Sequence, residues 1–324
     1  AAGWRPFSAW SVGDPDVLAA LSPDGRTAAV YQPQDVQGVE LVDAVTGASQ
    51  AELRGFIVAR GRPLDLAYTP DSILVLFENE ILVWGLARGA VVERLSFFKA
   101  PARELRLSPD REWAAVRAEY LTVYNLASKR LYNLGDQGAS QAYAFAPDGR
   151  AVALAVGTDV EVYSLASGRL ERRLLGRNKA IRGLAYTADG ARLVATSGDV
   201  WDAASGERLA TFDSAAGLET VTVSPNGAVI VGGDGEVWAL GPRPAGKLAR
   251  VGRVTGLPAG LGRGQMHFIQ DGALLFVQAP GQAPALFSVD PNAPRAAAGP
   301  TPASAATPDR EIIGLLNVSR LGAL

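Results

Sequence analysis

The sequence contains no cysteine and only one histidine and one methionine among its 324 residues. Without cysteine there can be no disulfide bond, no thiol nucleophile, no iron–sulfur cluster and no zinc site built on thiolates. The single histidine, His267, excludes a metal centre made of several histidines of one chain, and any Ser–His–Asp triad would have to use it. These absences exclude most of the familiar metal and nucleophile chemistries.

Long apolar runs and a strong charge imbalance are also missing. No stretch of 18 consecutive apolar residues is present, so the sequence predicts no transmembrane helix. The 31 basic and 33 acidic residues give a net charge of −2, which provides no general attraction to nucleic acid or to an anionic membrane surface. What the chain does have is an apolar fraction of 48%, enough to fill a core, together with 36 glycines and 20 prolines that indicate many turns.

A four-residue phrase of the type Ser-Pro-Asp-Gly recurs along the chain, at intervals of 37 to 47 residues. Its copies are Ser22–Gly25, Thr69–Ser72, Ser108–Arg111, Ala146–Gly149, Thr187–Gly190, Ser224–Gly227 and, more weakly, Ile269–Gly272. Proline presets φ, aspartate bonds its own backbone and glycine accepts a positive φ, so the phrase predicts a tight turn. Because a short apolar stretch stands on each side of the phrase, every copy predicts a β-hairpin.

A second hairpin follows in each unit, and its first strand ends near an aromatic residue in six of the seven copies. These residues are Trp84, Tyr124, Tyr163, Trp201, Trp238 and Phe287, and Val42 takes the position in the first unit. Four short strands over about 40 residues predict one blade of a β-propeller. Since the aromatic residue recurs so regularly, we interpret it as a ring wedged between neighbouring blades and not as a stacking platform for a ligand.

At these residues the chain resembles the WD-repeat and YVTN-type β-propeller superfamily, from about Asp16 to Asp290. The resemblance implies an all-β fold, a β-propeller of four-stranded antiparallel blades. It is a degenerate resemblance, because the Trp-Asp dipeptide survives only as Trp201-Asp202 and the Gly-His dipeptide is absent. The hydrogen-bonded tetrad of WD repeats therefore cannot form, and the resemblance specifies a fold without specifying a function.

We expect a single propeller domain over residues 1–324, with seven blades, and eight blades are the alternative. Residues 1–15 would supply a strand that closes the ring at the N-terminus. Residues 291–308 are rich in proline and alanine and predict a long loop, and residues 309–324 predict a C-terminal segment that helps to close the last blade. An eighth blade would need its first strand inside the proline-rich stretch, where proline cannot donate to a sheet ladder.

Candidate residues for chemistry are few. His267 falls on the predicted innermost strand of the seventh blade, where inner strands line the central channel. A general base also needs a partner that orients it, and no spacing in the sequence identifies one. The glycine-rich residues 232–236 and 260–264 predict a turn and a loop instead of a calcium or dinucleotide site. The sequence therefore predicts no catalytic, cofactor-binding or metal-binding residue and no cofactor.

Positive charge gathers in residues 169–182, which contain six basic residues and one acidic residue. The candidate partner-binding patch within it, called the basic patch below, consists of Arg172, Arg173, Arg177, Lys179 and Arg182. One interpretation is a solvated or internally paired cluster. The other is docking of an acidic partner, a polyanionic polymer or lipid head groups. Nucleic acid is not expected as a partner, because the whole chain is acidic and the patch lacks interleaved aromatic residues.

An intact repeat without a recognisable catalytic set predicts a non-enzymatic protein-interaction scaffold within a larger assembly. The small residues at Ala1-Ala2-Gly3 fit cleavage by a signal peptidase. We therefore expect an exported subunit of a cell-envelope complex, in the periplasm or at the cell surface and peripherally associated with the envelope, and a cytoplasmic protein is the alternative. Two other functions stay open. One is an enzyme of the lactonase or hydrolase type that uses the central channel, and the other is a module that binds a polysaccharide or a peptide.

Overall fold

The structure is a computed structural model, and it consists of short β-strands joined by turns and links. It describes residues 18–22, 26–31, 38–43, 48–54, 62–97, 101–136, 140–213, 217–254, 265–269, 274–278 and 285–288. Within these residues the strands form seven separate sheets. The described residues include no helix that is long and apolar enough to cross a membrane.

The strands follow one another through the sheets in chain order, except near β24. The first sheet contains β1 (Leu18–Leu21), β2 (Thr27–Tyr31), β3 (Gly38–Asp43) and β4 (Ser49–Arg54). The second contains β5 (Asp65–Tyr68), β6 (Ser72–Leu76), β7 (Ile81–Gly85) and β8 (Ala90–Leu95). The third contains β9 (Glu104–Leu107), β10 (Trp113–Arg117), β11 (Leu121–Asn125) and β12 (Leu131–Leu134). The fourth contains β13 (Ser140–Phe145), β14 (Ala151–Val156), β15 (Asp159–Ser164) and β16 (Leu170–Leu174). The fifth contains β17 (Leu184–Tyr186), β18 (Arg192–Ala195), β19 (Asp199–Asp202), β20 (Arg208–Thr211) and β24 (Gly246–Lys247). The sixth contains β21 (Val221–Val223), β22 (Val229–Gly232), β23 (Glu236–Ala239) and β25 (Arg250–Arg253), and the seventh contains β26 (Gln265–Ile269), β27 (Leu274–Gln278) and β28 (Ala285–Ser288).

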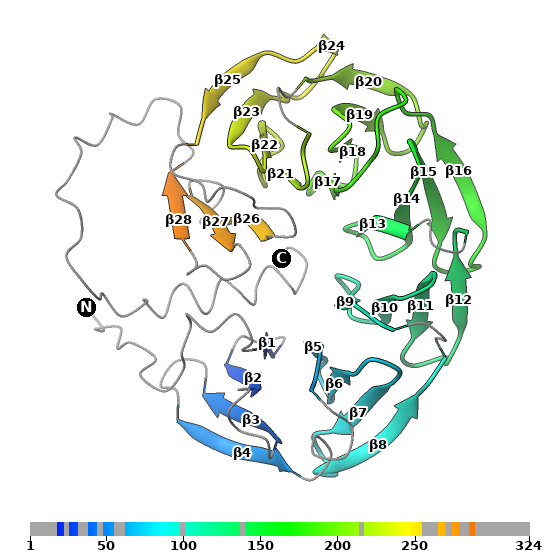
Figure 1. Ribbon diagram of the computed structural model, residues 1–324, viewed down its shortest axis with the longest axis vertical. Helices are drawn as coiled ribbons and strands as arrows, with labels where there is room; N and C mark the ends of the chain where they lie inside the picture. Colours follow the sequence, from blue (N-terminus) through cyan, green and yellow to red (C-terminus); the bar gives the residue numbers. More distant parts are fainter. Residues whose placement is uncertain are drawn as a thin grey trace, which may run out of the picture.

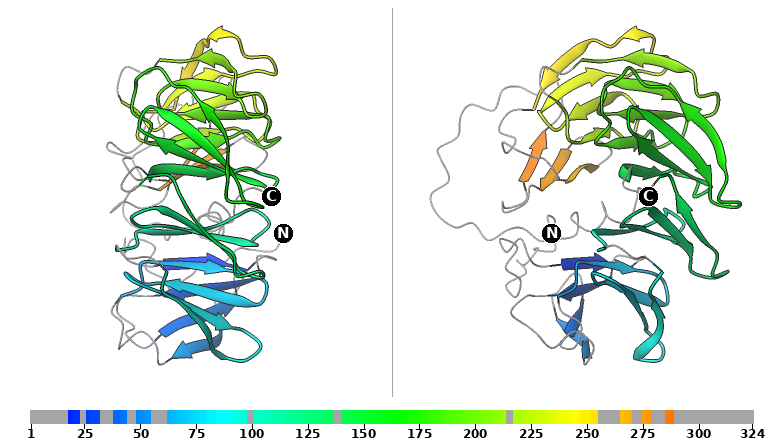
Figure 2. Two further views of the ribbon diagram at one scale, coloured as in Figure 1. Left: turned by 90° about the vertical axis from the view of Figure 1, so that its right-hand side faces the viewer. Right: turned by 45° about the vertical axis from the view of Figure 1, so that its right-hand side comes forward.

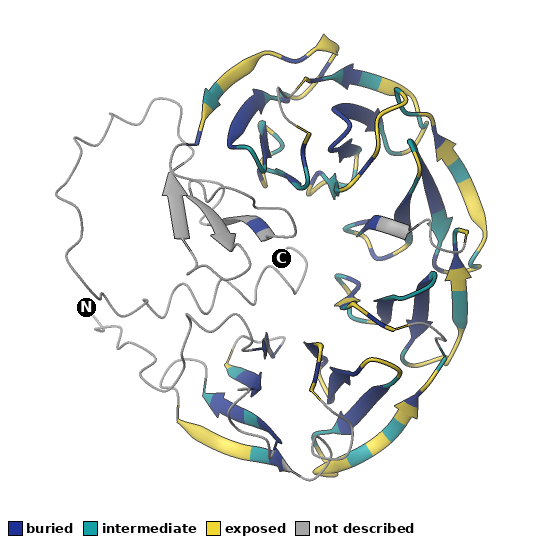
Figure 3. Cartoon of the chain, in the orientation of Figure 1, coloured by how far each residue is buried: buried dark blue, intermediate teal, exposed yellow. Residues whose placement is uncertain are grey.

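The sheets follow one another around a common centre, as in a propeller (Figure 1). The first strand of each four-stranded sheet lies toward the centre and the last lies at the periphery, and the edge-on view shows a flat arrangement with two faces (Figure 2). Burial follows the same order, because the middle strands are buried while the outer strands are largely exposed (Figure 3). Outer strand β8, for example, alternates exposed and partly buried residues along most of its length, whereas every residue of β6 is buried. The prediction of an all-β fold built from four-stranded antiparallel sheets is confirmed.

In the copies at residues 108–111, 146–149, 187–190 and 224–227, the recurring phrase forms the turn between the first and second strands with the predicted hydrogen bonds. The Asp189 carboxylate accepts the backbone N–H of Ala191 at 3.0 Å, and Gly190 has a φ of 69°. The first residue of the phrase has a role that the repeat pattern did not predict. Its hydroxyl, as in Thr187, donates to the aspartate and accepts the backbone N–H of Arg192 at 3.0 Å, so the turn is bonded on both sides.

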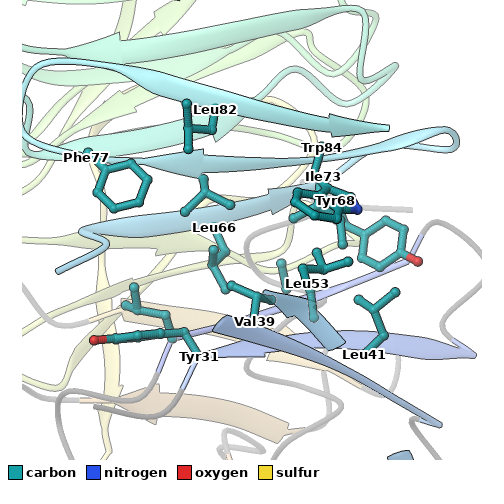
Figure 4. Close-up of a cluster of buried hydrophobic side chains, with 14 residues drawn as sticks. Tyr31, Val39, Leu41, Leu53, Leu66, Tyr68, Ile73, Phe77, Leu82 and Trp84 are labelled. Atoms are coloured by element: carbon teal, nitrogen blue, oxygen red, sulfur yellow. The ribbon is translucent and has the colours of Figure 1, made fainter. Parts of the chain in front are cut away.

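The recurrent aromatic residues pack between adjacent sheets, as the sequence predicted. Trp84 belongs to a buried cluster shared by the first and second sheets, in which Tyr31 and Val39 meet Leu66 and Ile73 (Figure 4). The other described copies join successive sheet pairs in the same way, and they are Tyr124, Tyr163, Trp201 and Trp238. The core is therefore a chain of inter-sheet clusters, each filled by large side chains of two neighbouring repeats.

The fifth sheet departs from the expected four strands. Its outer strand β20 pairs in parallel with β24, a segment that precedes the outer strand of the sixth sheet, with Ala210 opposite Gly246. The unpaired edge of β20 offers backbone groups that this segment satisfies. A φ of 64° at Gly246 belongs to the conformation that favours glycine, and this helps to explain the residue at the start of β24.

Several predictions concern residues outside the described part of the chain. They are the closing strand in residues 1–15, the loop in residues 291–308 and the closing segment in residues 309–324. His267 lies on β26, the first strand of the seventh sheet, as predicted, and its side chain is also outside the description. These assignments stay predictions.

Candidate functional site

The antiparallel order of the strands divides the loops between two faces of the arrangement. One face, called the turn face, carries the turns between first and second strands and between third and fourth strands, including residues 108–112, 126–130 and 146–150. The opposite face, called the link face, carries the loops between second and third strands and the links from one sheet to the next, including residues 118–120 and 175–183. Each face offers one candidate surface.

The basic patch spans the outer strand β16 and the link that follows it. Arg172 and Arg173 lie on β16, whereas Arg177, Lys179 and Arg182 lie in the link to β17. The structure thus brings the five predicted residues into one continuous segment at the boundary of the fourth and fifth sheets. Their side chains differ in what they contact.

Arg177 is held inside the fold by an acid and three carbonyl groups. Its Nε lies 2.9 Å from the Asp199 Oδ1, and the Asp199 side chain is 0% exposed. Its Nη2 donates to the carbonyl oxygens of Ser197 at 3.2 Å, Gly198 at 3.2 Å and Phe212 at 3.3 Å. Arg177 therefore connects the link to the fifth sheet, and its positive charge is paired within the chain.

The other four cations of the basic patch also have partners from neighbouring strands and turns. Arg173 pairs with Glu161 and Arg182 pairs with Glu219, while Lys179 Nζ lies 3.5 Å from Asp213 Oδ1. Arg172 donates to the backbone carbonyls of residues 203 and 204 in the next sheet. The patch is therefore charge-compensated, although Arg173, Lys179 and Arg182 keep side chains that are more than half exposed.

Neighbouring donors and cations lower the pKa of two aspartates, one beside the basic patch and one in a turn of the turn face. Hydrogen bonding and attraction to Lys247, followed by attraction to Lys179 and Arg177, lower the pKa of Asp213. On the turn face, hydrogen bonds from Thr187 and from the backbone of Ala191 lower the pKa of Asp189. Both carboxylates therefore stay ionised at neutral pH and keep their donors.

The turn face carries a groove of about 980 Å³ over the third, fourth and fifth sheets. Its apolar lining includes Trp113, Val162 and Leu165, which are buried. Its charged lining consists of Asp110, Glu112, Arg130, Asp148, Arg150, Glu171 and Arg172. The groove is an open hollow of the surface and not an enclosed cavity.

The walls of this groove are turns fixed by their own hydrogen bonds. Asp110 accepts the hydroxyl of Ser108 and the backbone N–H of Glu112. Gly149 has a φ of 69°, and a Cβ at this position would collide with the carboxylate of Asp110. The third and fourth sheets therefore approach each other closely here, and the groove is largely preformed.

Two charged side chains of the groove are available for a ligand. Neither the guanidinium of Arg150 nor the carboxylate of Glu112 makes a hydrogen bond or an ion pair in the described part of the chain. By contrast, Arg130 donates to the carbonyl of Ala166 at 3.3 Å, and Arg172 is occupied as described above. The groove thus presents one cation and one anion that have no partner among the residues that the structure describes.

Tyr186 adds a hydroxyl donor to the same groove. Its side chain is half-buried, and no hydrogen bond of its hydroxyl is present among the described residues. Burial raises the pKa of Tyr186 well above its usual value; Arg172 opposes this shift, and Asp148 and Glu171 reinforce it. The phenol therefore stays protonated at neutral pH and can donate to a ligand.

Sequence reasoning found the basic patch and missed the groove. The groove is assembled from three repeats, and no single segment of the sequence is rich in its residues. The only signal was the position of Glu112 and Arg150 directly after the recurring phrase, where a charged residue is left on the turn face. Among the described residues, no group of three or more histidine, aspartate or glutamate side chains could hold a metal ion.

Comparison with known proteins gives one informative similarity. No protein-family model matches the chain. An uncharacterized WD repeat-containing protein of Synechocystis sp. is 28% identical over 158 residues, which is 44% of this chain and 44% of that protein. The match therefore spans less than half the length of that relative. Together with the four-stranded sheets, it confirms the resemblance to WD-repeat propellers that the recurring phrase predicted.

Proposed function

We propose that the chain is a seven-bladed β-propeller that works as a non-enzymatic protein-interaction module and docks a segment of a partner protein in the turn-face groove. Seven sheets in order around a centre support closure into a ring. The similarity to a WD repeat-containing protein supports the same architecture. A rigid ring that presents preformed turns loses little conformational entropy when a partner binds, so it suits a docking role.

The observation that carries this proposal is the pair of available charges in the groove. Arg150 and Glu112 have no partner among the described residues, and the turns that bear them are held by their own bonds. A segment with an acidic side chain for Arg150 and a basic side chain for Glu112 matches this arrangement. Complementary charges of this kind give orientation and specificity.

The basic patch is proposed as a secondary contact surface for an acidic partner. Its exposed members are Arg173, Lys179 and Arg182, and each can be shared between an internal acid and a partner. Arg177, in contrast, is committed to the fold. Each exposed pair contributes little free energy, about 0 to 1 kcal/mol. The patch is therefore expected to tune association more than to determine it.

Membership of an exported cell-envelope complex is a further part of the proposal, and it comes from the sequence. Fractionation of the native cells, followed by detection of the protein in the periplasmic, membrane and cytoplasmic fractions, tests it. Recovery in the cytoplasm alone would contradict it.

Site-specific photo-crosslinking tests the docking proposal. A photoreactive amino acid is placed at Ala204, an exposed residue that lines the groove, and in a second variant at Lys179 in the basic patch. In the native host, we expect the groove position to cross-link one protein repeatedly and the patch position to give a weaker product. The crosslinked protein is then purified, and its direct binding to the full chain is measured. A protein that stays monomeric and gives no adduct at either position would overturn the proposal.

A further inference from the structure

The hydroxyl of Tyr143 is buried and has no hydrogen-bond partner within the described part of the chain. Tyr143 lies on β13, the inner strand of the fourth sheet, and is only 5% exposed. A buried polar group without a partner bears the full cost of leaving water. Because most buried polar side-chain atoms are hydrogen-bonded, an exception of this kind needs a physical explanation.

Charged side chains on the inner part of the second and third sheets lie around this hydroxyl. Arg106 on β9 stands over the tyrosine ring, with its Cζ 5.5 Å from the ring centroid. Burial is the largest reason why the pKa of Tyr143 lies well above its usual value, and charged neighbours also act on it. These neighbours are Asp65, Glu104, Arg106 and Arg117. The hydroxyl therefore faces a charged cluster, and it stays protonated at neutral pH.

The acceptors of this cluster are already in use. Glu104 pairs through one oxygen with Arg106 and through the other with Arg117 Nε at 3.1 Å. Asp65 accepts a backbone N–H with each oxygen, at 2.9 Å within β5 and at 3.1 Å from Leu105 on β9. The carboxylates therefore help to join the second and third sheets.

The donors, in contrast, are in excess. The Tyr143 hydroxyl has no acceptor, and Arg106 reaches Glu104 through Nε, so its two terminal amino groups have no hydrogen bond among the described residues. The Arg106 side chain is 49% exposed although it stands over a buried ring. A tyrosine hydroxyl and a guanidinium that stands over its ring are both donors, and a carboxylate, which accepts with two oxygens, can take a hydrogen bond from each.

We propose that Tyr143 and Arg106 form a binding site for a carboxylate group at the inner edge of the third and fourth sheets. The hydroxyl has almost no solvent contact, so a ligand reaches it when the long Arg106 side chain turns aside. Arg106 then keeps contact with the same carboxylate. This site lies on inner strands and uses no residue of the groove, so it is independent of the docking proposal.

The carboxylate can belong to a small molecule or to an acidic side chain of a polypeptide. Two probes separate these sources: succinate, and the peptide acetyl-Gly-Glu-Gly-amide, whose only carboxylate is on the glutamate side chain. Succinamide, which has the same shape without charge, is the negative control. Binding to the full chain is measured by calorimetry at constant ionic strength, because the interaction is electrostatic.

The test uses Tyr143→Phe and Arg106→Gln, with Tyr120→Phe as the matched control that removes a hydroxyl from a loop of the link face. We expect the wild type and the control to bind at least one carboxylate probe and to ignore succinamide. Tyr143→Phe and Arg106→Gln should each weaken binding by about tenfold or more, since hydrogen bonds to a charged group are lost. Without probe, Tyr143→Phe should be at least as stable as the wild type, because it loses no hydrogen bond.

Selective binding of succinate would assign the site to a free small acid, and selective binding of the peptide would assign it to an acidic side chain. The proposal is overturned if neither probe binds, or if Tyr143→Phe binds as tightly as the wild type. It is also overturned if Tyr143→Phe is less stable than the wild type without probe, because the hydroxyl would then already have a partner.

Discussion

The basic patch and the groove contain the same kinds of charged residue, but they differ in whether these residues have partners. The cations of the patch are paired within the chain, whereas two charges of the groove have no partner among the described residues. On the link face, Arg177 meets a buried carboxylate and three carbonyl groups, and Lys179 and Arg182 have acidic partners. Arg172, the member of the patch that also lines the groove, donates to two backbone carbonyls. On the turn face, Arg150 and Glu112 lie in a preformed groove without any partner among the described residues. The comparison shows that charge density along a sequence does not identify an available surface, because the neutralising acids come from other strands.

The largest effect is expected beneath the basic patch, at the wedged ring of Trp201. Its side chain is fully buried between the fourth and fifth sheets, and its indole N–H donates to the carbonyl of Leu175 at 3.2 Å. Trp201→Ala should lower the free energy of unfolding by about 3–5 kcal/mol, through lost apolar burial and a cavity. Urea unfolding measures this loss. Trp201→Phe, which keeps a ring, should lose less, and an unchanged midpoint for Trp201→Ala would contradict the wedge.

Replacing one arginine by methionine on each face tests whether Arg177 is paired within the chain while Arg150 is not. Arg177→Met leaves the carboxylate of Asp199 buried without its closest cation, so we expect a loss of about 3 kcal/mol, near the lower end for a broken buried pair because Arg177 is partly exposed. Arg150→Met breaks no hydrogen bond or ion pair among the described residues and should change stability by no more than about 0.5 kcal/mol. Equal losses in thermal or urea unfolding would show that the two arginines are not in different conditions.

A smaller effect is expected in the turns of the turn face. Asp189→Ala removes the acceptor for Thr187 and for the backbone of Ala191, which should cost about 0.5–1 kcal/mol at pH 7. Asp189→Asn should cost less, because Asn226 accepts equivalent bonds in the next repeat.

The pH dependence of that loss has a defined sign. The pKa of Asp189 is lower in the folded protein than its usual value, so the ionised carboxylate stabilises the fold above the unfolded pKa. The advantage of the wild type over Asp189→Asn should therefore shrink as the pH falls from about 5 through the folded pKa. Parallel unfolding curves at pH 7 and pH 3 measure it, and an advantage that grows in acid would contradict the assignment.

The sequence predicted the fold because its signals are local. The Ser/Thr-Pro-Asp-Gly phrase contains its own hydrogen bonds, as Thr187 and Asp189 show, and an aromatic residue such as Trp201 recurs 14 to 18 residues after the start of the phrase. A period of about 40 residues with four strands then leaves few architectures. The role of the first hydroxyl in the phrase could also have been read from the sequence, because serine or threonine occupies that position in most copies.

The basic patch could be located from the sequence, but its internal pairing and the groove could not be predicted, since they depend on contacts between distant repeats. The partner of Arg177 is 22 residues away, and Arg182 and its partner Glu219 are separated by 37 residues. The pairing of β20 with β24 and the cluster around Tyr143 likewise join segments that carry no common motif. The sequence alone does not indicate which cations are paired with acids from other strands.

Arg150→Glu should have the smallest effect on stability and the largest effect on partner binding. It therefore tests most directly the claim that the groove, and not the basic patch, is the main docking surface. The affinity of the crosslinked partner is measured for Arg150→Glu in the groove and for Lys179→Glu in the basic patch, after unfolding shows that both proteins are as stable as the wild type within about 0.5 kcal/mol. We predict that Arg150→Glu weakens binding by about tenfold or more, whereas Lys179→Glu changes it by about threefold or less. The reverse order, with the patch variant losing the partner and the groove variant keeping it, would contradict the account.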